Sequence, residues 1–333
     1  LAAAEKLIAR YREEDPDDRV IIFGETRIAA AKRDFEEAAR LAREEIRRGG
    51  DPNWEVFLAS VDRAGLDDAS RAAHERYIDS STGQAEGQAI SFRGTSNVWN
   101  GRFEPALADF DESTLIITRV GQSVTAELAA KSRMAHALTL WTVGRRAEAI
   151  DSARQAITID PWHPTAHYLL GRFLFEAGRE GEGERALAAF EEMNDESHSP
   201  DPADWLTLLR ADRALALGNP RQALAELGRL EGADADPLIR TFRRVSEGAA
   251  HEASGDLEAA LDAYRKAADP PELFFPTPLS LEIPALYHVA RLEEALGNPD
   301  AAREFYQRYL DRWGEADVET PEVMEARARL AAL

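Results

Sequence analysis

Apolar residues recur along most of this chain at the three- and four-residue spacing of amphipathic α-helices. Glycines at intervals of 34 to 43 residues separate these stretches: Gly65, Gly101, Gly144, Gly178, Gly218, Gly255 and Gly297. A helix C-terminus often ends in a left-handed backbone conformation, which glycine adopts without strain. The pattern therefore predicts helices that are paired through turns at these glycines and repeated along the chain.

Small residues recur at two fixed positions relative to the glycines. Seven residues before them, six of the seven positions hold Gly or Ala, and five residues after them all seven hold Ser, Gly or Ala. Small facing residues let two antiparallel helices approach closely, and larger residues one turn further on, such as Phe110 and Tyr306, fill the space between neighbouring pairs. The predicted fold class is an all-α solenoid of antiparallel helix pairs.

The clearest unit is MAHALTLWTVGRRAEAIDSARQAITIDP, which runs from Met134 to Pro161. With the small residues Ala137 and Ala149 on either side of Gly144, this unit resembles the tetratricopeptide repeat family. The resemblance extends over residues 51–313 and implies a right-handed superhelix of about seven to eight repeats. No unit carries the family's early Trp, and four of the six glycine intervals exceed 36 residues, which predicts an irregular superhelix.

We expect a single solenoid over residues 1–333. A proline suits the first position of the last predicted helix, which would cap the final apolar face of the stack. The expected parts, in chain order, are N-terminal helices with a weak first repeat (1–50, with helices at 3–14, 20–31 and 32–48), seven repeats (51–313) and a capping helix (321–333).

Two stretches interrupt the repeat pattern. Residues Ser80 to Gln88 are polar, and we predict a loop there. Residues Asp269 to Pro284 contain five prolines around apolar residues such as Phe274 and Phe275, and proline prevents a helix in this setting. This second segment either folds back into the groove of the solenoid or presents an exposed partner site.

Composition narrows the classes of function. The formal net charge is −21, and we expect no nucleic-acid binding because phosphate contacts need clustered positive charge. The chain has no cysteine, which excludes disulfides, zinc–thiolate sites and thiol nucleophiles. No apolar run approaches the ~18 residues that span a bilayer, so we expect no membrane insertion by this chain. We expect a cytoplasmic location, while these features leave an extracytoplasmic one open.

The sequence contains two weak chemical motifs. His163 and His167 have the spacing of two metal ligands on one helical face, but no third ligand accompanies them. The segment from Gly181 to Ala186 fits a loose dinucleotide-binding fingerprint, yet a helical pattern stands where that fingerprint needs a strand. We therefore expect no metal, no cofactor and no enzyme activity, and we predict no catalytic residues.

The first helices of stacked helix pairs line the concave face of a solenoid. Positions on that face, counted back from the turn glycines, give a predicted partner-binding groove: Lys131, Trp141, Tyr168, Arg172, Phe175, Trp205, Asp212, Tyr287 and Arg291. Aromatic residues and arginine commonly carry the binding energy of protein interfaces. The alternative is that some of these residues, above all Trp141, are core residues between repeats.

We expect a non-enzymatic module that binds a protein or peptide segment in this groove. The C-terminal sequence YQRYLDRWGEADVETPEVMEARARL resembles the tetratricopeptide regions that close bacterial signalling kinases, nucleotide cyclases and winged-helix regulators. That resemblance implies a docking arm of a larger regulatory protein. Two alternatives are a small-molecule-sensing repeat domain of a transcription regulator and a helical-toroid enzyme. A toroid brings its first and last helices together, whereas this chain has unlike ends.

Overall fold

The computed structural model describes residues 2–15, 19–32, 34–48, 68–121, 123–196, 201–230, 237–268 and 281–333. Helices and short turns make up these ranges, and no strand occurs within them, so the predicted all-α fold class is confirmed. The helices, in chain order, are α1 (Ala2–Glu14), α2 (Arg19–Ala31), α3 (Phe35–Arg47), α5 (Asp68–Ser80), α6 (Gln84–Trp99), α7 (Phe103–Val120), α8 (Ser123–Thr142), α9 (Arg146–Ile159), α10 (Pro164–Glu176), α11 (Glu180–Glu196), α12 (Asp201–Ala216), α13 (Pro220–Leu227), the 3₁₀ turn η1 (Gly228–Leu230), α14 (Pro237–Ala253), α15 (Leu257–Ala268), α16 (Glu282–Ala295), α17 (Pro299–Trp313) and α18 (Pro321–Ala332).

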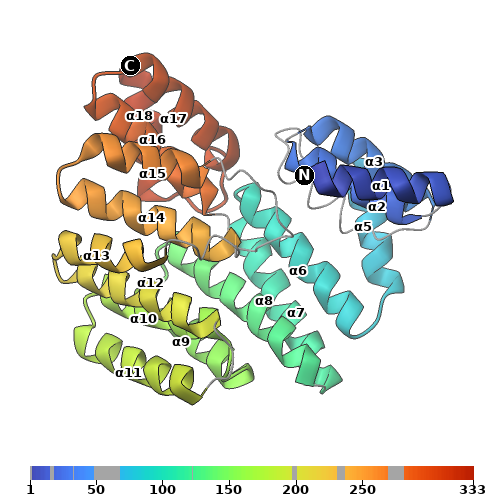
Figure 1. Ribbon diagram of the computed structural model, residues 1–333, viewed down its shortest axis with the longest axis horizontal. Coiled ribbons are helices and arrows are strands. Elements are labelled where there is room, and N and C mark those ends of the chain that lie inside the picture. Colours follow the sequence, from blue (N-terminus) through green and yellow to red (C-terminus); the bar gives the residue numbers. More distant parts are fainter. Residues whose placement is uncertain are drawn as a thin grey trace.

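From α6 onward the helices pair as antiparallel hairpins that lie side by side in a superhelix (Figure 1). Each hairpin turns at a predicted glycine whose φ lies between 69° and 82°: Gly101, Gly144, Gly178, Gly218, Gly255 and Gly297. At Gly144 the glycine N–H donates to Trp141 O at 3.1 Å, and this hydrogen bond closes the turn. The predicted turn at Gly65 lies outside the described residues. Every other predicted turn glycine is confirmed.

The small residues lie where neighbouring helices cross. A Cβ added to Gly183 of α11 would lie 2.6 Å from Phe175 Cε1 of α10, its hairpin partner. A Cβ added to Gly171 of α10 would lie 2.6 Å from Leu209 Cδ2 of α12, in the next hairpin. Glycine is therefore required at these two crossings by packing, because both residues are helical and need no unusual backbone angle.

Replacing Gly183 by Ala will destabilise the protein, although alanine is the better helix former. The added methyl group overlaps the Phe175 ring, and overpacking of this kind typically costs about 1–3 kcal/mol. Gly181→Ala is the matched control, because its nearest neighbour in the same helix, Arg185 Nη1, lies 3.9 Å away. Urea denaturation of both variants measures the difference. Equal stabilities would show that the α10–α11 crossing does not need glycine.

Three helices precede the regular stack. The predicted helices at 3–14, 20–31 and 32–48 correspond to α1, α2 and α3, which lie at the blue end of the chain in Figure 1. Helices α2 and α3 bury Ile22, Ala38 and Leu41 between them, as expected for a hairpin with a small core. Apolar spacing was therefore sufficient to predict these helices.

The polar loop predicted at Ser80–Gln88 is confirmed only for residues 81–83. Helix α6 begins at Gln84, and only residues 81–83 separate it from α5. Gly87, which lies inside the predicted loop, is buried in α6 and packs against Ile117 of α7. Glycine is needed here because two helices cross closely. In a sequence, a glycine of this kind cannot be distinguished from a glycine in a loop.

The proline-rich segment predicted at Asp269–Pro284 is described only from Leu281 onward. Residues 269–280 lie outside the described residues. The non-helical prediction is wrong for its last three residues, because α16 begins at Glu282 and includes Pro284 in its first turn. Proline is tolerated there because the first N–H groups of a helix have no intrahelical partner.

The superhelix closes on itself, because the hairpin α6/α7 contacts the end of α17. Trp313 of α17 donates its indole N–H to Val98 O at 2.9 Å, and its ring packs edge-on against Phe103 with centroids 5.2 Å apart. A continuous hydrophobic cluster joins residues of α6, α7 and α8 to residues of α15, α16, α17 and α18. The unlike ends of the chain did not lead us to expect this closure between α6 and α18.

Asp317 stabilises this closure. It caps helix α7, whose first residue, Phe103, lies 214 residues away in the sequence. Its carboxylate accepts the N–H groups of Phe103 at 2.8 Å and Glu104 at 3.1 Å, at the start of α7. Its own N–H donates to Gly101 O at 3.0 Å. The residue before α7, Arg102, provides no side-chain cap, so Asp317 fills the place of an N-cap residue.

Candidate partner-binding site

Closure leaves a cavity of about 260 Å³ on the inward side of the superhelix. Its wall comes mainly from the first helices of four hairpins, α8, α10, α14 and α16, together with α15, α17 and the starts of α9 and α18. Aromatic rings make up much of this wall. The described lining residues are Leu138, Trp141, Thr142, Arg146, Arg172, Phe173, Phe242, Val245, Tyr264, Leu281, Pro284, Ala285, Tyr287, His288, Tyr309, Trp313, Thr320 and Glu322.

Three of the predicted groove residues, Trp141, Arg172 and Tyr287, line this cavity together. Trp141 is half-buried and stacks on Phe173, with ring centroids 4.4 Å apart and an interplanar angle of 8°. The guanidinium of Arg146 lies 5.2 Å from the centroid of the Trp141 ring. Trp141 thus contributes to the core between hairpins and also to the cavity surface.

Three further predicted groove residues lie outside the cavity. Lys131 is exposed and pairs with Glu127 at 2.5 Å, while the partly exposed Arg291 pairs with Glu252 at 2.5 Å. Phe175 is buried within its own hairpin, against α11. That these residues bind a partner stays a prediction.

Tyr168 and Trp205 are buried beneath the inward surface. Their ring centroids lie 5.1 Å apart, and both rings contact Phe242, at 5.0 Å from Tyr168 and 5.7 Å from Trp205. This cluster joins α10, α12 and α14 across three hairpins. Through Phe242, which lines the cavity, it holds part of the cavity wall in place.

A buried polar network holds Arg172 in the cavity wall. Its guanidinium donates to Glu176 at 2.6 Å and to the Tyr168 hydroxyl at 3.0 Å. Asp212, another predicted groove residue, accepts from the Tyr168 hydroxyl at 2.8 Å and from Ser246 at 2.5 Å. Burial alone would lower the pKa of Arg172, but the charge of Glu176 and then its other partners raise it well above the usual value. Arg172 therefore stays charged and fixed in orientation.

His288, which also lines the cavity, was not among the predicted groove residues. Its ring stacks on Tyr264 with centroids 4.6 Å apart and an interplanar angle of 9°. Burial, assisted by the positive charge of Arg291, lowers its pKa to about 4, so the imidazole is neutral near pH 7. It directly follows the predicted groove residue Tyr287. The groove positions were counted at fixed intervals from the turn glycines, and His288 does not fall on one of them.

Comparison with protein families identifies the repeat. Models described as tetratricopeptide repeats match residues 134–201, 208–272 and 283–312. The chain belongs to the tetratricopeptide repeat family. The matched ranges include the hairpins whose first helices, α10, α14 and α16, contribute to the cavity wall.

Several solved structures resemble the chain, among them a tetratricopeptide repeat protein. One, from Parabacteroides merdae, is 12% identical with a TM-score of 0.46, and the match covers 89% of this chain and 98% of that one. NprR, solved in complex with its cognate peptide NprX, is 12% identical with a TM-score of 0.44, over 92% of this chain and 81% of that one. YrrB, described as having an unusual peptide-binding site, is 17% identical with a TM-score of 0.31, over 59% and 91%. No curated protein matches the chain significantly.

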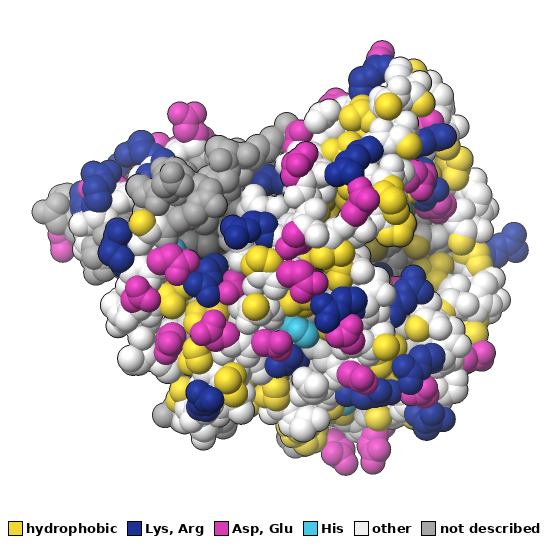
Figure 2. Space-filling model, turned by 180° about the vertical axis from the view of Figure 1, so that it is seen from behind, with side chains coloured by type: hydrophobic (Ala, Val, Ile, Leu, Met, Phe, Trp, Pro, Cys, Tyr) yellow, Lys and Arg dark blue, Asp and Glu magenta, His cyan; other side chains and the backbone are white. Residues whose placement is uncertain are grey.

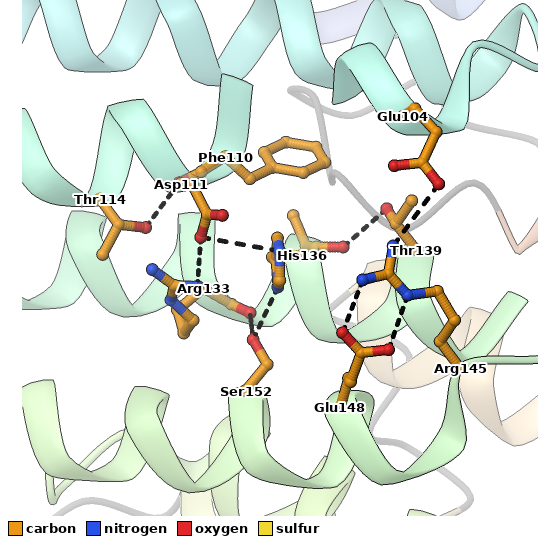
Figure 3. Close-up of polar contacts among 11 residues, drawn as sticks. Glu104, Phe110, Asp111, Thr114, Arg133, His136, Thr139, Arg145, Glu148 and Ser152 are labelled. Carbon is orange, nitrogen blue, oxygen red and sulfur yellow. Dashed lines mark hydrogen bonds and ion pairs between the residues drawn. The ribbon is translucent and has the colours of Figure 1, made fainter. Parts of the chain in front are cut away.

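One polar cluster of this tetratricopeptide chain has the residue types of a hydrolase triad (Figure 3). His136 Nδ1 lies 3.0 Å from Ser152 Oγ, and His136 Nε2 lies 3.6 Å from Asp111 Oδ1. Ser152, however, is only 3% exposed, and its hydroxyl donates to the backbone oxygen of Arg133 at 3.1 Å. A nucleophile needs access to substrate and a proton directed at its base. The cluster instead ties α7, α8 and α9 together.

The weak metal motif has a structural explanation. His167 Nε2 lies 2.8 Å from Pro161 O, and its ring stacks on Phe190. Across the described parts of the chain, no group of three or more His, Asp or Glu side chains is placed to hold a metal ion. Within the same ranges, no helix has the length and apolar character needed to cross a membrane.

Acid will destabilise the fold through His288. In the unfolded chain the His288 imidazole is protonated near its ordinary pKa of 6.5, whereas in the folded chain it is protonated only near pH 4. Above this window His288 has no effect on the pH dependence of the free energy of unfolding. Inside it, that free energy falls by up to about 1.4 kcal/mol for each unit of decrease in pH.

Urea denaturation of the wild type and of His288→Phe, at about pH 7.5 and about pH 5, measures this effect. The variant should lose less stability between the two values, because its aromatic ring keeps the stacking on Tyr264 without a titrating group. His136, whose pKa burial also lowers to about 4, contributes equally to both proteins. Identical pH dependence in the two proteins would contradict the assignment of a partly buried, neutral His288.

Proposed function

We propose that this tetratricopeptide repeat chain is a non-enzymatic binding module that holds a peptide or protein segment on its inward face. The observation that carries the proposal is the cavity on the inward side of the closed superhelix, whose wall is built mainly from the first helices of four hairpins. Trp141, Arg172 and Tyr287 contribute to it, and these are residue types on which interfaces depend. Arg172 and Trp141 are already fixed by their neighbours, which lowers the entropy cost of binding.

The charge distribution on one face of the molecule supports a specific inward site over general electrostatic attraction. On the face seen in Figure 2, Lys, Arg, Asp and Glu side chains are interspersed, with hydrophobic side chains visible among them. The acidic excess of the chain therefore forms no single patch on that face. We also infer, from the C-terminal sequence resemblance alone, that the chain serves as a docking arm of a larger bacterial regulatory protein in the cytoplasm.

Selection from a random peptide library on the immobilised chain tests the proposal. Peptides that bind the wild type should bind Trp141→Ala at least about tenfold more weakly, because an interface residue of this kind contributes more than about 1.4 kcal/mol. Arg146→Glu reverses the charge on the exposed part of the same surface and should also weaken binding of these peptides. Leu115→Ala, at an exposed position on α7 that does not line the cavity, is the control. Enrichment of no peptide, or equal binding to all four proteins, would overturn the proposal.

A further inference from the structure

The cavity contains a polar side chain that has no hydrogen-bond partner among the described residues. His288 Nδ1 is buried without a partner, and no described residue makes a hydrogen bond with the other ring nitrogen either. Because Nδ1 is covered, Nε2 is the nitrogen that a molecule in the cavity can reach. An orphaned buried N–H is rarer in proteins than an orphaned buried acceptor, which favours the tautomer that carries its proton on Nε2. His288 therefore offers one N–H donor to the cavity.

The charged groups of the wall do not favour an ionic ligand. Arg172 is neutralised by Glu176 and held by the Tyr168 hydroxyl. The other two charged residues of the described lining, Arg146 and Glu322, are solvent-exposed and have opposite signs. An ion placed among the aromatic rings would lose its hydration without gaining a buried counter-charge. The interior of the cavity thus suits an uncharged group.

The shape of the wall favours a planar group. Two stacked pairs of rings contribute to it, Trp141 on Phe173 and Tyr264 on His288, with interplanar angles of 8° and 9°. Aromatic rings bind other rings in offset-stacked or edge-on arrangements, and this ring–ring attraction adds to the gain from burying apolar area. A volume of about 260 Å³ accommodates one small ring system and excludes a folded partner element.

We propose that this cavity binds an uncharged planar aromatic group carrying one hydrogen-bond acceptor, which receives the Nε2–H of His288. This inference rests on the proposed function, because the group can be a side chain of the bound segment, such as a phenol ring. A free phenol-like compound offers the same chemistry. The two sources differ in whether a peptide backbone must also be accommodated at the cavity.

Calorimetric titration with p-cresol tests the inference, with toluene as the matched probe that lacks the acceptor. Toluene should bind the wild type about fivefold to tenfold more weakly, as expected for one lost hydrogen bond to a buried site. His288→Phe should remove that difference by weakening p-cresol alone. N-acetyl-tyrosinamide distinguishes the sources: its binding assigns the site to a residue of a segment, and binding of p-cresol alone assigns it to a free compound.

Val245→Phe fills the cavity from α14 and should abolish binding of both probes, while Leu115→Phe on the exposed face of α7 should change neither. Thr142→Phe fills the cavity from α8 and replaces Val245→Phe if that variant does not fold. The inference fails if p-cresol does not bind the wild type, or if binding survives in the filled cavity. Library peptides that bind without any aromatic residue would overturn this inference and leave the proposed function standing.

Discussion

Replacing Trp313 by Ala will open the superhelix and lower the free energy of unfolding by about 3–5 kcal/mol. Trp313 is only 2% exposed and donates to Val98 O, while its ring contacts Phe103 of α7 and Tyr309 of its own helix. Truncation removes this contact across the closure and leaves a cavity that the α6/α7 hairpin cannot fill without moving. Urea denaturation will report the loss of stability, and small-angle X-ray scattering will report an increased radius of gyration.

Trp162→Ala is the control for this variant, because it removes the same residue type from a position that is 56% exposed. Its effect should stay within about 0.5 kcal/mol, with no change in the radius of gyration. Asp317→Ala tests the cap separately and should cost about 1–2 kcal/mol. An unchanged radius of gyration in Trp313→Ala would contradict closure through this contact.

Replacing Asp212 by Ala will destabilise the protein by about 3–5 kcal/mol, because it breaks a buried charged network. The hydroxyl groups of Tyr168 and Ser246 lose their acceptor, and each unsatisfied buried group costs about 1–3 kcal/mol. Burial raises the pKa of Asp212, and its contact with Arg172 opposes that rise. Chemical denaturation provides the measurement.

Asp262→Ala provides the comparison, since Asp262 is a largely exposed residue whose ion pair with Lys266 lies on the surface of α15. Its loss should cost no more than about 0.5 kcal/mol. Asp212→Asn keeps an acceptor for one hydroxyl and should fall between the two. If Asp212→Ala were as mild as Asp262→Ala, the network would not be what fixes Arg172 in the cavity wall.

The hairpins could be predicted from the sequence because their causes are local. A turn that needs a positive φ selects glycine, as at Gly144, and a close crossing selects a small residue, as at Gly183. A packing glycine was missed at Gly87, because it lies inside a polar stretch that we predicted to be a loop. Local composition alone does not distinguish these two uses of glycine.

The closure could not be predicted, because its partners have no sequence signature. The acceptors and donors that meet Trp313 and Asp317 are backbone groups at Val98, Phe103 and Glu104, which any sequence would carry. The residues that line the cavity could be predicted only in part, for a related reason. Residue types that favour interfaces also fill cores, and whether Trp141 lines a cavity or Trp205 lies beneath it depends on the curvature of the whole stack.

A distance measurement across the closure tests the central claim most directly. The chain has no cysteine, so spin labels at Glu104 and Glu319, both exposed, would be the only two in the molecule. Double electron–electron resonance should give one narrow distribution at the short end of the measurable range, which Trp313→Ala shifts to longer distances. A broad or long distribution in the wild type would mean an open superhelix without the enclosed aromatic cavity.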